Sequence, residues 1–323
     1  MSIEVNRYAG ATPWDGKGEY VGDKGDTAVE ALLNSSANFT VSKHKVFTQP
    51  CPNWTTPEIE VENYRAVVRD DTQQVVGLTG KNFSLYQPLQ LAQFADDIAM
   101  NRDMKVHTIG VDNGGSKIWM LCKIGSVEIV PDDKVDHYLF LLNGHDGKTA
   151  LQAMFTSIRV VCSNAARVAV SQAKGEVVRI RHTKNMVVNP AEARRVLRIG
   201  EGAFKESDDF MRSLAQVTMP ASKWMDFCHT LFPNPEVDDN GEFSQRALTT
   251  AEKNRSTLTS LYFDGRGARI PGVQGTAWGA YNAVTEFAGY HRQTRGNQRF
   301  ESLMTGSGAD FVRRSTNVLR ELV

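Results

Sequence analysis

The residues best suited to chemistry in this chain are basic, and they concentrate in one stretch. Residues 159–198 hold nine Lys and Arg side chains and two acidic ones, whereas residues 201–252 hold ten acidic and four basic ones. Cations that neutralise phosphates release condensed counterions, which is the main sequence-independent contribution to nucleic-acid binding. The stretch therefore predicts phosphate contacts, and the alternative is a set of solvated faces on adjacent elements. The candidate residues are Arg159, Arg167, Lys174, Arg179, Arg181 and Lys184.

Three strand-like runs must position these side chains. They cover residues 138–142, 153–161 and 177–182, and glycine-containing turns over 143–147 separate the first two. A short helix is expected from Ser163–Asn164, which suit an N-cap, to Gly175, which suits its end. Because side chains alternate along a strand, Arg179 and Arg181 share one face of the third run. Phe155 or His182 would lie near enough to stack on bases.

A second candidate lies in residues 263–276, which hold four glycines. Arg266 and Arg269 in this loop resemble a mobile arm that contacts a nucleic-acid backbone, and the alternative is an exposed linker. The aromatic stripe that follows, with Trp278 and Tyr281, is typical of a helix docked onto the sheet rather than of base stacking.

Enzymatic chemistry has weaker support in the sequence. Residues 144–149 imitate the end of a phosphate-binding P-loop, but Leu142 occupies the position of its first glycine and a hairpin turn fits better. Catalytic motifs of hydrolases and metalloproteases are lacking, and the four cysteines have no metal-ligand spacing. We therefore expect no cofactor and no metal. A metal-dependent nuclease with scattered ligands stays open, and its candidate residues are Asp132, Asp133, Asp146 and Glu286.

The composition is that of an ordinary globular protein. The net charge is zero, which argues against a surface coated by nucleic acid on every side. Apolar runs fall short of the ~20 residues needed to cross a bilayer, and residues 1–10 lack the layout of a signal peptide. We expect a cytoplasmic protein that has no membrane partner.

The order of elements predicts an α+β fold built on a largely antiparallel sheet with hairpins and packed helices, followed by a helical C-terminal region. Hairpins are expected around the turns at 70–73 and 112–115, and a helix is expected to begin at Pro88. The expected division of the chain is an N-terminal arm and helix (1–38), an α+β core (39–189), a helical segment (190–262) and a Gly-rich loop with C-terminal helices (263–323).

Several strings resemble a family of phage- and plasmid-encoded proteins known only as a domain of unknown function. The resembling stretches are residues 82–88 (NFSLYQP), 158–164 (IRVVCSN), 180–183 (IRHT), 278–286 (WGAYNAVTE) and 306–309 (GSGA). The likeness spans about residues 30 to 320. This family supplies no enzymatic motif to transfer.

The element order is also similar to that of recombination-type single-strand annealing proteins, the RecT and Red-beta superfamily. This likeness implies a phage- or plasmid-derived protein that binds single-stranded DNA in the bacterial host and promotes annealing without nucleotide hydrolysis. It also implies a homo-oligomer, ring or filament, and a phage exonuclease or replication protein as a partner. The alternatives are the nuclease above and a non-catalytic protein-interaction or structural protein.

Overall fold

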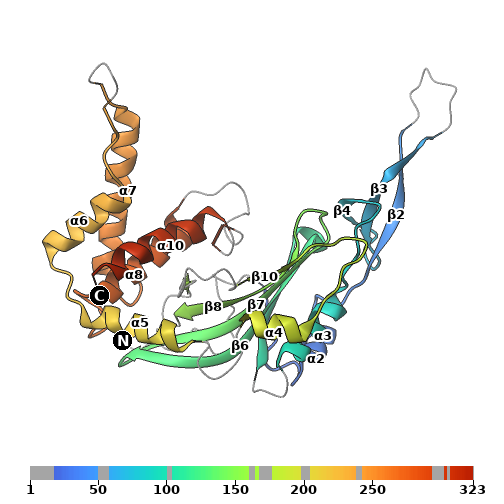
Figure 1. Ribbon diagram of the computed structural model, residues 1–323, viewed down its shortest axis with the longest axis horizontal. Coiled ribbons are helices and arrows are strands. Elements are labelled where there is room, and N and C mark those ends of the chain that lie inside the picture. The colour runs from blue at the N-terminus through green and yellow to red at the C-terminus, as the bar shows by residue number, and fades with distance from the viewer. Residues whose placement is uncertain are drawn as a thin grey trace.

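A computed structural model describes residues 18–49, 58–99, 104–159, 164–166, 177–197, 204–237, 242–292, 302–303 and 306–322 (Figure 1). These residues form two sheets and two groups of helices. The expected α+β class is confirmed, because every strand pairing is antiparallel and the helices follow or flank the strands rather than alternate with them.

The larger sheet has seven strands in the order β1-β5-β6-β7-β8-β10, with β9 also paired to β8. Long strands form its centre, and the predicted turns at 112–115 and 143–147 connect them. The strands are β1 (Glu19–Tyr20), β5 (Lys105–Asp112), β6 (Lys117–Val130), β7 (Asp133–Gly144), β8 (Leu151–Arg159), β9 (Asn164–Ala166) and β10 (Val177–Ile180).

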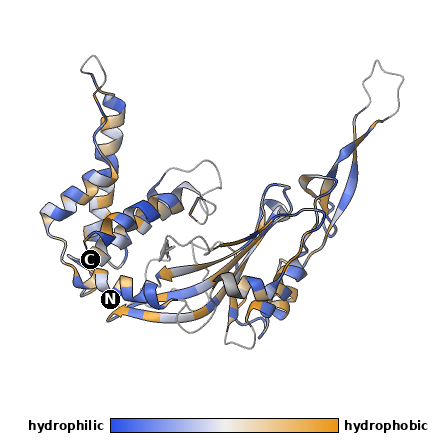
Figure 2. Ribbon diagram, in the orientation of Figure 1, coloured by the Kyte–Doolittle hydropathy of each residue, from blue (hydrophilic) through white to orange (hydrophobic). Residues whose placement is uncertain are grey.

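The smaller sheet has three strands, β2 (Val41–Phe47), β3 (Glu60–Arg69) and β4 (Val75–Gly80). The predicted turn at 70–73 joins β3 to β4, and Gln73 adopts a positive φ of 58° there. Figure 1 shows β2 and β3 extending away from the body of the protein, and Figure 2 shows β2 as largely hydrophilic. The root of this ribbon packs through Val41, Val67 and Val76.

Three helices cover one face of the larger sheet: α2 (Ala28–Leu33), α3 (Pro88–Ala99) and α4 (Pro190–Leu197). Helix α3 buries Leu91, Phe94, Ala95 and Ile98, a spacing that places them on one side of the helix. Helix α2 begins with a capping box in which Thr27 and Glu30 bond to each other's backbone N–H groups.

The remaining helices form a C-terminal unit around Trp278, Tyr281 and Phe311. Its core also contains Ile129 and Val135, so the unit is docked on the ends of β6 and β7. The elements are α5 (Lys205–Gln216), α6 (Ala221–Leu231), α7 (Gln245–Asp264), α8 (Ala277–Glu286), a π-helical turn (Phe287–His291) and α10 (Ser307–Arg320).

The structure divides the chain differently from the sequence-based expectation. Of the expected N-terminal arm and helix, residues 18–38 belong to the α+β core, because β1 pairs with β5 and α2 shares a core with α3, and residues 1–17 lie outside the described residues. Helix α4 packs on the larger sheet through Ala193. The remainder of 190–262 shares one core with 263–323, so these two regions form one unit where they are described.

The helix expected to begin at Ser163 is not formed at its start. Asn164–Ala166 is instead strand β9, which pairs with the end of β8 so that Asn164 lies opposite Arg159. The rest of that expected helix, with Arg167 and Lys174, lies outside the described residues. No helix in the described part of the chain has both the length and the apolarity that crossing a bilayer requires.

Candidate nucleic-acid interface

Arg159, at the end of β8, is buried and neutralised. Its guanidinium is bidentate to Asp133, with Nε–Oδ1 and Nη2–Oδ2 distances of 2.6 and 2.8 Å, and the two side chains are 2% and 0% exposed. It also donates to the carbonyls of Arg266 and Gly267, each at 3.1 Å. Trp278 Nε1 donates to the same Asp133 carboxylate at 2.8 Å. This Arg159 cluster (Arg159, Asp133, Trp278) joins the sheet to the C-terminal unit.

The burial of Arg159 corrects the expectation that it contacts phosphate beside Arg179. Strand register places Arg179 opposite Gln152 and Arg159 opposite Val135, at the two ends of β8. Positions 152 and 159 are about 23 Å apart along a strand that rises ~3.3 Å per residue. The arginines expected to form one row therefore do not converge.

The Gly-rich loop is also held by this cluster rather than free. The backbone N–H of Arg266 donates to Glu286 Oε2 at 3.0 Å, while its carbonyl accepts from Arg159. Burial raises the pKa of Glu286, and the bond from Arg266 opposes that rise. Arg269 is exposed and pairs with Asp264 at 2.6 Å. These contacts correct the expectation of a mobile arm.

At the opposite end of β8, exposed cations gather where β10 approaches the small sheet. Val178 and Ile180 pack on the helix-covered face of the large sheet, as their alternation predicts, and Arg179 faces Gln152 with an Nη2–Oε1 distance of 3.3 Å. Within the described ranges, no carboxylate forms an ion pair with any cation of this group. We call it the basic strip, and it comprises Lys43, Lys81, Arg179, Arg181 and Lys184, all with exposed side chains.

Lys43 on β2 contacts the chain segment of Lys81, which in turn packs against the segment of Arg181. Its Nζ donates to the carbonyls of Phe83 and Lys81 at 2.8 and 3.2 Å. The ring of Phe83 stacks on His182, with 4.5 Å between centroids and 17° between planes. Lys43 and Arg181 are thus linked through one stacked pair of rings, although they lie far apart in the sequence.

Two of the family-like strings meet beneath the strip. Ser84 donates its backbone N–H to the His182 carbonyl and its hydroxyl to the Thr183 carbonyl, at 3.4 and 2.7 Å. In return His182 Nδ1 lies 2.8 Å from the Ser84 carbonyl. These bonds hold residues 180–184 against residues 82–86, and so they position Arg181 and Lys184.

A second buried histidine supports the same junction. His145 Nδ1 and Nε2 lie 2.8 and 3.1 Å from the carbonyls of Gly115 and Tyr86, and Asn143 donates to Tyr86 as well. Burial lowers the pKa of His145 against the opposing effect of the Gly115 and Tyr86 carbonyls, and it lowers the pKa of His182 against that of the Ser84 carbonyl. The imidazoles are structural supports of the strip, and His182 lies too deep to stack on a base.

The candidate nuclease carboxylates make separate contacts and do not form one group. Asp133 binds Arg159, while Asp146 accepts from the N–H groups of Lys148 and Thr149. Asp132 is exposed in the β6–β7 turn, and Glu286 bonds to the Gly-rich loop. Among the residues that the structure describes, no three His, Cys, Asp or Glu side chains form a group that could hold a metal ion.

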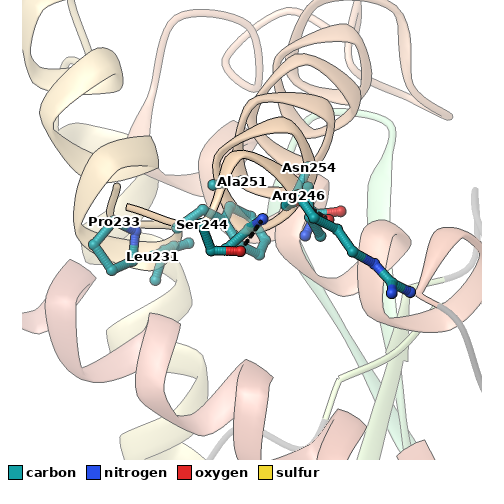
Figure 3. Close-up of a pocket in the computed structure, with 9 residues that line it drawn as sticks. Leu231, Pro233, Ser244, Arg246, Ala251 and Asn254 are labelled. Atoms are coloured by element: carbon teal, nitrogen blue, oxygen red, sulfur yellow. Dashed lines mark hydrogen bonds between the residues drawn. The ribbon is translucent and has the colours of Figure 1, made fainter. Parts of the chain in front are cut away.

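Two pockets are relevant to binding. One of about 460 Å³ opens between the end of α6 and the start of α7, and Figure 3 shows the Arg246 side chain directed away from Leu231 and Pro233. The other, of about 380 Å³, lies between α3 and residues 186–190, next to the basic strip. Of these two pockets, only the second lies beside the basic strip.

These features define the class: an antiparallel α+β protein with a docked helical unit and a basic strip at the root of a β-ribbon. Residues 75–305 match the family model "Domain of unknown function (DUF932)", and the chain belongs to this family. No curated protein and no solved structure matches the chain.

Sequence reasoning found Arg179, Arg181 and Lys184 but missed Lys43 and Lys81. Those two belong to the strip only because β2 and the segment after β4 fold beside residues 180–184. A signal in the sequence was the string at 82–88, next to Lys81. It resembles the same family as the string at 180–183, and the two strings lie side by side in the structure.

Proposed function

We propose that this protein binds single-stranded DNA along the basic strip and promotes annealing of complementary strands without nucleotide hydrolysis. The observation that carries the proposal is the strip itself: five exposed cations from three chain segments, none paired with a carboxylate of the described residues. Unpaired exposed cations keep their full charge for a polyanion, whereas paired ones are already neutralised.

The limited extent of the strip agrees with the zero net charge of the chain. A few phosphate contacts give moderate, salt-dependent affinity rather than tight wrapping. Annealing needs this property, because the strands must be screened from mutual repulsion and then released as duplex. Assembly into a ring or filament would repeat the strip and multiply the contacts.

Self-association has support of its own in the small sheet. Tyr64, Val75 and Leu78 of β3 and β4 are about half exposed or more, at 49%, 62% and 54%. Such a group of exposed apolar side chains is typical of an interaction surface. We propose that copies of the chain associate through it, and sedimentation of the wild type beside Leu78→Glu tests this.

The proposed function is tested by charge reversal of Arg179, Arg181 and Lys184 to Glu in one variant. We expect its affinity for a single-stranded oligonucleotide to fall roughly a hundredfold at low salt. The slope of log affinity against log salt should decrease by about 2, because each phosphate contact on a single strand contributes ~0.7. The acceleration of strand pairing in the absence of ATP should be lost as well.

A matched control reverses three exposed cations of the helical unit, Arg212, Lys223 and Lys253. This control carries the same change in net charge, so it should retain both affinity and annealing. No binding by the wild type at low salt, or an equal loss in the two variants, rejects the proposal.

A further inference from the structure

We infer that the pocket beside the basic strip holds one unpaired nucleobase while the strip holds the neighbouring phosphates. This inference rests on the proposed function and adds to it a site for the base. The pocket has a volume of about 380 Å³ and lies between helix α3 and the segment before α4. Its lining residues are Ser84, Leu85, Tyr86, Gln90, Gln93, Phe94, Asp97, Met186, Val188 and Pro190.

One turn of chain connects the pocket to the strip. The N–H of Met186 donates to the carbonyl of Thr183 at 3.0 Å, and that carbonyl also accepts from the Ser84 hydroxyl. Lys184 therefore lies on the strip while Met186, two residues later, lines the pocket. A nucleotide whose phosphate contacts Lys184 has its base within reach of the pocket.

The pocket wall formed by α3 suits a planar, neutral, hydrogen-bonding ligand. Gln90, Gln93 and Asp97 follow a spacing that places them on one exposed face of the helix. The amide oxygen of Gln90 accepts from the Gln87 N–H at 2.8 Å, which fixes its orientation. Gln93 has no hydrogen-bond partner among the described residues, so its whole carboxamide is available to a base edge.

Apolar and aromatic groups complete the pocket. Tyr86 donates its hydroxyl to the Gln90 carbonyl at 3.1 Å, and burial with the nearby Asp97 carboxylate raises the pKa of Tyr86 to about 12. The neutral ring lines the pocket, and an aromatic side chain there can pack against a base. Met186 contributes a polarizable thioether opposite the helix.

Charge separates the roles of pocket and strip. The Asp97 carboxylate on the pocket wall repels phosphate, whereas the strip attracts it. The base of an intact duplex stays in its stack and cannot enter, because extrusion costs a few kcal/mol. The pocket thus favours single strands over duplex.

The test compares two ligands: a single-stranded oligodeoxyribonucleotide of mixed sequence and a chain of equal length and charge built from abasic units. Wild-type protein should bind the first about tenfold more tightly than the second, as expected for one base that stacks and hydrogen-bonds. Gln93→Leu, at an exposed helix position, should remove most of this preference and leave the affinity for the abasic chain unchanged. Gln245→Leu, the same change at an exposed position of α7, should leave both affinities at their wild-type values.

Three other results of this experiment would overturn the base pocket, and one of them would also overturn the proposed function. Equal wild-type affinity for the two ligands overturns the base pocket and leaves the proposed function in place. An equal loss of affinity for both ligands in Gln93→Leu also overturns the pocket, because the residue would then act on the backbone. Failure of the wild type to bind either ligand overturns the pocket and the proposed function together.

Discussion

The two ends of strand β8 use arginine in opposite ways. At one end Arg159 is enclosed, bidentate to Asp133 and bonded to the Gly-rich loop. At the other end Arg179 is exposed, and its side-chain hydrogen bond among the described residues goes to the neutral amide of Gln152. The difference lies in the cross-strand neighbours: β7 begins with Asp133 beside Arg159, whereas the residue opposite Arg179 is the neutral Gln152. The role of an arginine is thus decided by its cross-strand environment and not by its own strand.

The largest expected effect is on stability at the buried end. Arg159→Ala should lower the free energy of unfolding by about 3–5 kcal/mol, because it leaves the Asp133 carboxylate buried without its partner. Arg179→Ala, at the exposed end, should change it by no more than about 0.5 kcal/mol. Urea unfolding of the two variants beside the wild type measures both values. Equal stability of the two variants would contradict the comparison.

A double variant sharpens this prediction. Asp133→Asn combined with Arg159→Met should lower the free energy of unfolding by less than the sum of the two single changes. Each single change leaves one buried charge without its partner, whereas the double variant leaves no charge in the pair. Trp278 Nε1 can still donate to the amide oxygen of Asn at position 133. Full additivity would show that the two side chains are not energetically coupled.

Substitutions of the exposed arginines at the basic strip should moderately weaken the affinity for single-stranded DNA and leave the free energy of unfolding unchanged. Arg181→Ala should weaken binding to single-stranded DNA about five- to tenfold at low salt, a loss of about 1 kcal/mol. Fluorescence anisotropy across a salt series measures this loss. Lys253→Ala, on the far helical unit, is the matched control and should bind as the wild type does.

Acid should affect the strip end through its buried histidines. Burial lowers the pKa of His182 in the folded protein. Below about pH 6.5 the unfolded state therefore binds a proton at this residue more readily than the folded state does. Stability is therefore complete above that pH and falls as the pH drops from about 6.5 toward the folded-state pKa. His145 responds in the same direction, and the His182 Nε2 atom has no partner among the described residues.

The measurement is the free energy of unfolding of the wild type and His182→Phe between about pH 7.5 and about pH 5.5. The phenylalanine keeps the stack on Phe83 and removes the titrating group. Its stability should therefore depend less steeply on pH in this window. An unchanged slope would show that His182 does not titrate on unfolding.

Local signals carried most of the fold prediction. The turns at 70–73, 112–115 and 143–147 and the helix that begins at Pro88 all arise from neighbouring residues, and the structure contains each of them. The strand at Asn164–Ala166 was missed because its sequence also suits a helix cap. Pairing with the end of β8 decided between the two conformations.

The site was less predictable because its contacts are long-range. Asp133 and Arg159 are 26 positions apart, and Lys43 lies 40 positions from the Phe83 carbonyl that it binds. A count of charges along the sequence places Arg159 among the free cations, although its partner strand neutralises it. Only the register of β7 with β8 reveals the carboxylate beside it.

The smallest expected effect concerns Arg269, which tests whether the Gly-rich loop takes part in binding. Arg269 and Asp264 are 80% and 61% exposed, so their pair contributes little and Arg269→Gln should change the free energy of unfolding by less than about 0.5 kcal/mol. The loop carrying it lies at the Arg159 end of β8, far from the basic strip. Affinity of Arg269→Gln for single-stranded DNA should therefore stay within about twofold of the wild type. A loss as large as that of Arg181→Ala would extend the interface to both ends of β8, and the contrast between a structural and a binding end would fail.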